Sequence, residues 1–238
     1  MEKYIQIPTA DDMMIPGILN SKGNTDKLVI FVHGFTGTMN EAHLYSAKEY
    51  FTNKWYDVFR FNLYASGESF RKLRDCSVKM HAEDIQLVSD NFTNYSEIYF
   101  VGHSLAGPCL ATVNKYPENV NKLIFWDPAF EMWTTGRKFY REWESIRYQS
   151  SWKHIEISPE MEKEFLEDNF LEILTKQDFS KQDIFSIYAD WDRHVNLKPK
   201  LESFWIESCI IQWANHGFTQ EWKYEELFEK TLEYINKK

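Results

Sequence analysis

Short apolar runs recur along the chain with helical patterns between them, and this alternation constrains the fold more than any other feature. Most runs are continuously apolar rather than alternating, which is typical of strands covered on both faces of a parallel sheet. The runs comprise residues 28–32, 58–61, 98–101, 123–126, 184–188 and 209–211. Strands that alternate with helices build α/β folds with right-handed crossovers. We therefore predict an α/β protein with a mostly parallel sheet.

The segments between and before these runs support the same architecture. Apolar residues recur at helical spacing over 78–92 and again over 224–235, which predicts a helix in each segment. Residues 4–7 and 14–19 flank a polar turn, and this pattern predicts an N-terminal antiparallel hairpin on the sheet edge.

Residues 130–179 interrupt the alternation, because no clear strand appears there and the composition is helical. Pro159 after Ser158 predicts a helix that begins there and runs through Asn169. We predict one domain spanning 1–238, with a helical cap inserted at about 130–179. Aromatic and basic residues gather in 130–155, where they suit a lid over an apolar acyl pocket or an anionic substrate. Packing within the cap and a solvated helix face are the simpler interpretations of the same residues.

Composition excludes several classes of protein. The 27 Lys and Arg against 36 Asp and Glu give a net charge of −9, which disfavours binding to nucleic-acid phosphates. We expect no membrane segment, because no apolar run approaches the ~18 residues that a spanning helix needs. No secretory leader is visible, so we expect a cytoplasmic protein. The three cysteines are widely spaced and fit free thiols rather than disulfides or a zinc site.

Ser104 carries the strongest chemical signal. It directly follows the predicted strand 98–101, precedes a helical run, and stands in the sequence Gly-His-Ser-Leu-Ala-Gly, residues 102–107. A nucleophile on a tight strand-to-helix turn needs small residues two positions away on each side, and Gly102 and Ala106 meet that need. Ala106 departs from the usual G-x-S-x-G pattern but is still small. The alternative is a serine that merely caps the helix. We predict that Ser104 is a nucleophile.

A nucleophilic serine needs a base and an orienting acid. In α/β folds that carry the serine on such a strand-to-helix turn, the acid follows the serine in the sequence and the histidine follows the acid. The strand 184–188 leads into Asp190 and Asp192, and the last strand leads into His216. All three follow strand ends, where open α/β sheets bind ligands. We predict His216 as the base and Asp192 as the acid, with Asp190 shaping the turn. His194 is a rival base, placed only two residues beyond the predicted acid.

The oxyanion of a tetrahedral intermediate needs two amide donors. The sequence His-Gly-Phe-Thr-Gly at 33–37 follows the first central strand, and Gly34 permits close backbone approach there. We predict the amides of Phe35 and Leu105 as the two donors. A glycine turn with no chemical role is the alternative.

These blocks resemble those of α/β-hydrolase-fold serine esterases, and among them the small bacterial feruloyl (cinnamoyl) esterase-like group. The resemblance rests on residues 33–37, the turn at 102–107, Asp192 and residues 215–218, and thus spans 28–218. Residues 62–69 also resemble the D-x-x-G-x-G-x-S turn of that family, but Asn62 and Ala65 replace its Asp and a Gly. The resemblance implies a lid over the site, no cofactor and no metal.

Metal chemistry has little support in the sequence itself, because the seven histidines show neither H-E-x-x-H nor a paired spacing. The sequence also lacks the G-x-G-x-x-G turn that dinucleotide binding needs.

We predict a hydrolase of small-molecule carboxylic esters with small or aromatic acyl groups, acting through an acyl-enzyme on Ser104. Acyl-thioester hydrolysis or acyl transfer would use the same triad. A non-catalytic binding protein on the same fold is a third possibility. Oligomeric state is not predicted.

Overall fold

The computed structural model describes residues 1–23, 25–131, 139–142, 145–149, 154–179 and 181–237, and it describes no side chains between 132 and 154. The strands are β1 (Glu2–Pro8), β2 (Met14–Asn20), β3 (Lys27–Val32), β4 (Asp57–Phe61), β5 (Glu97–His103), β6 (Val120–Trp126), β7 (Phe139–Glu142), β8 (Ser145–Gln149), β9 (His154–Ile157), β10 (Asp183–Ala189) and β11 (Glu207–Ile211). The helices are α1 (Ala42–Asn53), α2 (Val78–Asn91), α3 (Ala106–Thr112), α4 (Pro159–Glu167), α5 (Phe170–Lys176), α6 (Lys198–Ser203) and α7 (Lys223–Asn236), with short 3₁₀ turns η1 (Leu73–Asp75) and η3 (Arg193–Leu197).

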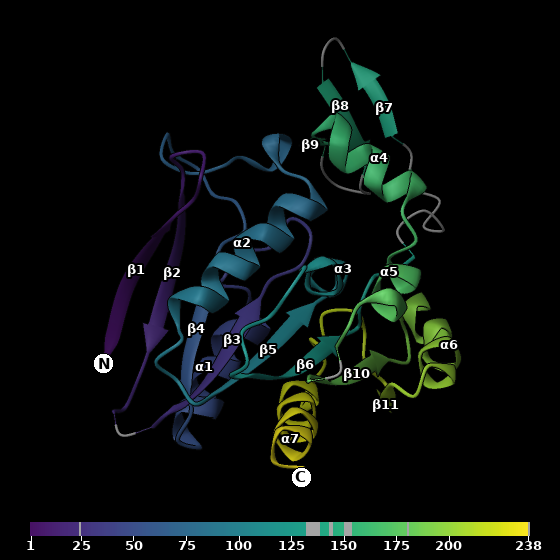
Figure 1. Ribbon diagram of the computed structural model, residues 1–238. Helices are drawn as coiled ribbons and strands as arrows, with labels where there is room; N and C mark the ends of the chain where they lie inside the picture. The colour runs from purple at the N-terminus through teal and green to yellow at the C-terminus, as the bar shows by residue number, and fades with distance from the viewer. Residues whose placement is uncertain (24, 132–138, 143–144, 150–153, 180, 238) are drawn as a thin grey trace.

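The main sheet has eight strands in the order β1-β2-β4-β3-β5-β6-β10-β11 (Figure 1). β1 pairs antiparallel with β2, and β2 with β4, whereas every other pair of neighbours is parallel. This arrangement confirms the predicted α/β class, the parallel sheet and the N-terminal hairpin. All carboxyl ends of the parallel strands meet at one edge, and the loops after β3, β5, β6, β10 and β11 therefore converge there.

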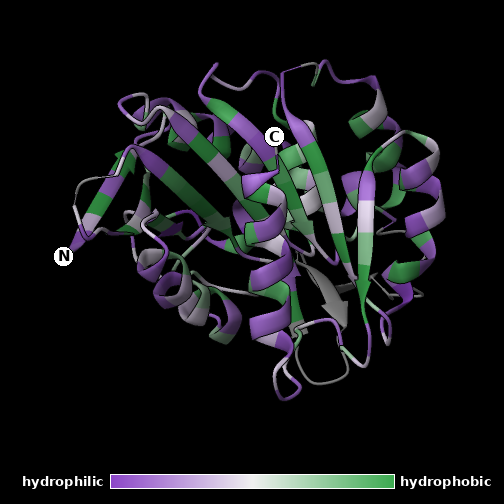
Figure 2. Ribbon diagram, turned by 90° about the horizontal axis from the view of Figure 1, so that it is seen from below, coloured by the Kyte–Doolittle hydropathy of each residue, from purple (hydrophilic) through white to green (hydrophobic). Residues whose placement is uncertain are grey.

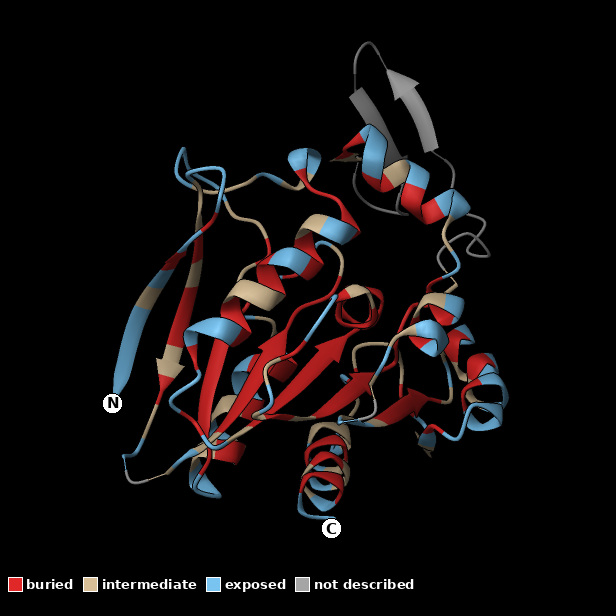
Figure 3. Cartoon of the chain, viewed as in Figure 1, coloured by how far each residue is buried: buried red, intermediate tan, exposed pale blue. Residues whose placement is uncertain are grey.

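The central strands are continuously apolar because both faces of the sheet are covered, as expected. In β3, Leu28 and Ile30 pack into the core on one side of the sheet, whereas Val29 and Phe31 pack into the core on the other. Residues of α2 and α3 complete the first core, and residues of α1 and α7 complete the second. Apolar residues accordingly concentrate in the strands and polar ones on the outer helix surfaces (Figure 2), and buried residues fill the centre of the sheet (Figure 3).

The inserted segment differs from its prediction. β7, β8 and β9 form a separate antiparallel sheet of three strands, so the expectation that this half of the cap is helical is wrong. These strands are only four or five residues long, which gives too little periodicity to recognise. Trp133 and Arg137 lie outside the described residues, and the side chains of Phe139, Tyr140 and the other aromatic and basic residues up to Lys153 are not described.

The second half of the insertion is helical, as predicted. Ser158 caps α4 by accepting a hydrogen bond from the Met161 amide at 2.9 Å, and Pro159 occupies the first turn. The single predicted helix is two, however, because Asp168 is extended and Asn169 caps α5.

The inserted segment is anchored on the rest of the chain by polar contacts at the start of α2. The Glu164 carboxylate accepts hydrogen bonds from the Val78 amide at 2.5 Å and the Lys79 amide at 3.1 Å. The Ser158 hydroxyl donates to the Cys76 carbonyl at 2.6 Å. These bonds use free amides at a helix N-terminus, so they fix α4 above the carboxyl edge of the sheet (Figure 1).

Two further expectations concern the whole chain. Cys76, Cys109 and Cys209 are free thiols, as predicted. Of the helices that the structure describes, none combines the length and apolar character needed to cross a bilayer.

Candidate active site

Ser104 sits on a strained turn between β5 and α3. Its backbone has φ 56°, a left-handed conformation that costs a residue with a side chain about 1–3 kcal/mol. A Cβ on Gly102 would lie 2.5 Å from Leu110 Cδ1 and 3.0 Å from Ala106 Cβ, so a side chain at position 102 would crowd the start of α3. The Ser104 amide is held by the Trp126 carbonyl at 3.0 Å. Strain, small neighbours and position agree with the predicted nucleophile turn.

His216 lies against Ser104, as predicted. Its Nε2 is 2.9 Å from Ser104 Oγ, and its Nδ1 is 2.6 Å from Asp127 Oδ2. A ring whose Nδ1–H donates to a carboxylate leaves Nε2 free to accept the hydroxyl proton. The loop that carries His216 is fixed from below, because His103 Nε2–H donates to the His216 carbonyl at 2.8 Å.

The acid in hydrogen-bond contact with His216 is Asp127, which the sequence analysis missed. Asp127 directly follows β6 and is fully buried; its other oxygen, Oδ1, accepts a hydrogen bond from the Ala189 amide at 3.2 Å. The predicted acid, Asp192, is also brought to His216, but its Oδ2 lies 3.6 Å from Nδ1. The hydrogen bond expected of Asp192 is therefore made by Asp127. The available signal was an aspartate directly after the predicted strand 123–126.

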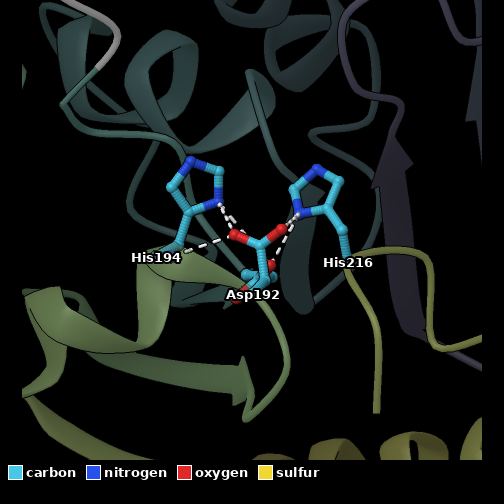
Figure 4. Close-up of side chains that lie close together, drawn as sticks. Asp192, His194 and His216 are labelled. Atoms are coloured by element: carbon cyan, nitrogen blue, oxygen red, sulfur yellow. Dashed lines mark hydrogen bonds and ion pairs between the residues drawn. The ribbon is translucent and has the colours of Figure 1, made fainter. Parts of the chain in front are cut away.

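His194 lies on the other side of the two carboxylates from the base. Its Nδ1 is 2.9 Å from Asp192 Oδ1 and 3.6 Å from Asp127 Oδ2. Figure 4 shows the Asp192 carboxylate between the imidazoles of His194 and His216. Ser104 hydrogen-bonds to His216 and not to His194. His194, the rival base of the sequence analysis, is instead a partner of the two aspartates.

Asp192 and His194 shift each other's pKa in opposite directions. Burial alone would raise the pKa of Asp192, but the His194 ring, whose Nδ1 lies 2.9 Å from Oδ1, and the His194 amide, which donates to Oδ1, hold that pKa well below its usual range. Burial alone would lower the pKa of His194, but the carboxylates of Asp127 and Asp192 raise it instead. The two carboxylates beside His194 thus favour the protonated form of its ring.

Asp190 was expected to shape its own turn, but its side chain bonds to a distant segment instead. Its Oδ1 accepts a hydrogen bond from the Ala214 amide at 2.9 Å, and its own amide donates to the Ile211 carbonyl at 3.3 Å. Asp190 thereby ties the loop after β10 to the loop that carries His216.

In the loop after β3, hydrogen bonds fix the orientation of the peptide group between Gly34 and Phe35. The Gly34 carbonyl accepts hydrogen bonds from His33 Nδ1–H at 2.8 Å and from the Gly37 amide at 3.1 Å. His33 is fixed in turn, because its Nε2 accepts from the Leu63 amide at 3.0 Å, and burial lowers its pKa to about 4. Since carbonyl and amide of one peptide point in opposite directions, the Phe35 amide points away from these donors.

That loop packs closely on the nucleophile. A Cβ on Gly34 would lie 3.0 Å from Ser104 Cβ and 3.2 Å from the His103 carbonyl, so glycine permits the approach. Leu105, the second predicted donor, directly follows Ser104 and is fully buried at the start of α3. The Phe35 ring meets Phe165 of the cap edge-on, with ring centroids 5.7 Å apart. The cap therefore contacts the same loop.

A cavity of about 350 Å³ opens beside the nucleophile. It is lined by residues of three loops and by the starts of α1 and α7, among them Phe35, Glu41, His43, Ser104, His216 and Tyr224. Burial raises the pKa of the Glu41 carboxyl to about 7 and lowers that of His43 to about 4. The nucleophile and base thus face a space large enough for a small substrate group.

The chain belongs to the alpha/beta hydrolase fold family, whose model matches residues 27–184. Among solved structures it is similar to Est1E from Butyrivibrio proteoclasticus with bound ferulic acid, at 19% identity and a TM-score of 0.78, covering 98% of this chain and 100% of that one. It is also similar to DcsB in complex with a substrate analogue, at 13% identity and a TM-score of 0.78, with 99% of each chain covered.

A third similar structure is the dienelactone hydrolase from Anabaena variabilis, at 12% identity and a TM-score of 0.70, covering 99% of this chain and 96% of that one. No curated protein sequence matches the chain. At these identities the likeness establishes the fold, and the esterases among the neighbours agree with a hydrolase that resembles the feruloyl esterase-like group.

Proposed function

We propose that the protein is a serine hydrolase of carboxylic esters that works through an acyl-enzyme on Ser104. One observation carries the proposal: Ser104, His216 and Asp127 form a continuous hydrogen-bonded chain, with distances of 2.9 and 2.6 Å, on a strained nucleophile turn. Nucleophile, base and orienting acid in this geometry are what acyl transfer needs. Asp192 and His194 are not members of this hydrogen-bonded series. They form an ion pair beside Asp127, the orienting acid.

In the proposed reaction, Ser104 Oγ attacks the ester carbonyl carbon while His216 Nε2 takes the hydroxyl proton. Asp127 holds the ring in the tautomer that accepts this proton and stabilises the imidazolium that forms. The amides of Phe35 and Leu105 stabilise the oxyanion. As the intermediate collapses, the alcohol leaves with the proton from His216. Water then attacks the acyl-enzyme with His216 again as base, and the carboxylic acid and free Ser104 result.

The proposed substrates are esters of small or aromatic carboxylic acids. The aromatic contact of Phe35 with Phe165 supports an apolar acyl site under the cap, because aromatic rings supply rigid apolar area. Est1E, which binds ferulic acid, shares the fold over its whole length, and this supports hydroxycinnamate esters as the first aromatic substrates to assay.

The test is a substrate panel with the wild-type protein and its Ser104→Ala variant. p-Nitrophenyl esters of increasing acyl length, methyl ferulate and acyl-CoA thioesters are compared by kcat/KM. The proposal expects turnover of oxygen esters that Ser104→Ala loses by about 10⁶ in kcat, as for a catalytic serine in a protease. Preference for acyl-CoA would reassign the protein to thioester hydrolysis or acyl transfer. No turnover of any substrate would favour a binding protein.

A further inference from the structure

Three polar side chains that no step of the proposed reaction uses meet inside the cavity beside Ser104. Glu41 immediately precedes α1, His43 lies in its first turn, and His103 ends β5. Each offers one ligand atom, and the three atoms lie within 4.8 Å of one another. Glu41 Oε2 and His43 Nε2 are 3.8 Å apart.

These three atoms have no hydrogen-bond partner among the described residues. Glu41 Oε2, His43 Nε2 and His103 Nδ1 are all inaccessible to solvent and unpaired there. The backbone and side chain of His43 and His103 are almost fully buried, each at 5% exposure. A buried polar atom without a hydrogen-bond partner destabilises the folded protein. Three buried atoms without hydrogen-bond partners in the described part of the chain, one carboxylate oxygen and two imidazole nitrogens, lie close enough together to share one positively charged ligand.

The hydrogen bond that His103 makes determines its tautomer, and the tautomer determines which ring nitrogen can bind a ligand. Its Nε2–H donates to the His216 backbone carbonyl at 2.8 Å, so Nδ1 carries a lone pair. A metal-binding histidine commonly donates its second N–H to a backbone carbonyl in this way, which fixes both ring orientation and tautomer. The absence of a Cβ on Gly34 also keeps the space open, since that Cβ would lie 3.3 Å from His103 Nδ1.

We propose that Glu41, His43 and His103 bind a divalent transition-metal ion such as Zn²⁺. Two imidazole nitrogens and a carboxylate suit Zn²⁺ better than Mg²⁺ or Ca²⁺, which prefer oxygen ligands. Bonds of about 2.0–2.2 Å place tetrahedral ligands roughly 3.4 Å apart, so small side-chain movements complete the site. Three protein ligands leave one position for water or a substrate group.

The position of the ion has a consequence for the proposed esterase. The same cavity is lined by Ser104 and His216, so a bound ion occupies space next to the nucleophile. A bound ion also shifts the ring of His103, whose Nε2–H donates to the His216 carbonyl and so positions the loop that carries the base. Zn²⁺ therefore acts as a reversible inhibitor and not as part of the hydrolytic reaction. The inhibitory effect rests on the proposed function, whereas metal binding does not, and binding is therefore measured separately.

A second group of possible ligands makes a discriminating control necessary. Asp127, Asp192, His194 and His216 also bring their ligand atoms within 4.8 Å of one another. There, however, the aspartates already pair with the two histidines. The two clusters share no residue, so single substitutions separate them.

The test titrates the wild-type protein with ZnCl₂ alone in a non-coordinating buffer, with calorimetry as the readout and the visible spectrum of Co²⁺ as a second. We expect saturable binding of one ion. His43→Gln and Glu41→Gln should each weaken it at least about 100-fold, the upper end of the loss for residues that merely support a ligand. His81→Gln, which removes another fully buried histidine, is the matched control and should leave the affinity unchanged.

Zinc should also raise the melting temperature of the wild type but not that of Glu41→Gln, because only a protein that binds the ion is stabilised by it. Glu41 is only partly buried, so this variant serves if His43→Gln does not fold. The proposal is overturned if the wild type shows no saturable zinc binding. It is equally overturned if His194→Gln abolishes binding while His43→Gln and Glu41→Gln leave it intact. Binding without inhibition would overturn only the inhibitory role.

Discussion

Substitution of the two aspartates beside His216 separates their roles. In Asp127→Asn, an amide replaces the carboxylate that lies 2.6 Å from His216 Nδ1. An amide N–H facing Nδ1 favours the tautomer with the proton on Nε2, which cannot take the proton of Ser104. The equivalent swap in a serine protease lowers kcat by about 10⁴. At 1.36 kcal/mol per tenfold, this corresponds to about 5.4 kcal/mol of transition-state stabilisation.

Asp192→Asn should cost far less. Asp192 lies 3.6 Å from His216 Nδ1, beyond hydrogen-bond distance, and its Oδ1 accepts from the His194 amide, a bond that asparagine retains. What is lost is charge pairing with His194. We expect a decrease of about tenfold, or about 1.4 kcal/mol.

The assay is kcat/KM on a p-nitrophenyl ester, measured on variants whose melting shows them to be folded. The reasoning is refuted if Asp192→Asn loses more activity than Asp127→Asn, because Asp192 would then orient the base. It is also refuted if Asp127→Asn keeps a tenth of the wild-type value.

Three further predictions follow from the same geometry. Asp190→Asn should keep most activity, since an asparagine oxygen still accepts from the Ala214 amide, and a loss as large as that of Asp127→Asn would show a chemical role for Asp190. Dialysis against EDTA should not lower the esterase rate, and a loss restored by Zn²⁺ or Mg²⁺ would indicate a metal-activated water instead. Burial lowers the pKa of His33 to about 4 and that of His81 to about 3, so the unfolded state binds more protons below pH 6.5. These two histidines therefore lower the free energy of unfolding as pH drops from 6.5 towards 4, so urea titrations should find that the wild type loses stability relative to His33→Gln over that range, and the same pH dependence in both proteins would contradict this origin.

The sequence was most informative where a local pattern has one structural solution. Continuous apolar runs such as 28–32 belong to strands covered on both sides, and they predicted the sheet correctly. Ser104 was recognisable because a tight strand-to-helix turn needs small neighbours: a Cβ on Gly102 would lie only 3.0 Å from Ala106 Cβ beside the turn at φ 56°. His216 followed from its place after the last strand.

The sequence was least informative where contacts between distant segments decide the outcome. Asp127 and Asp192 both follow strands, and only the three-dimensional positions show which one reaches His216 at hydrogen-bond distance. The cap strands are too short for periodicity to identify them. Glu41, His43 and His103 meet only because α1 begins beside the end of β5, and no spacing within the sequence indicates that meeting.

The central claim is that Ser104 is an activated nucleophile, and labelling with a fluorophosphonate probe tests it most directly. Such probes react with serines whose hydroxyl is activated by a neighbouring base, as Ser104 is placed to be by His216 at 2.9 Å. Intact-protein mass spectrometry and peptide mapping should find one adduct, on Ser104, which disappears in Ser104→Ala. A folded wild-type protein that takes up no probe, or takes it up at another residue, would contradict the account.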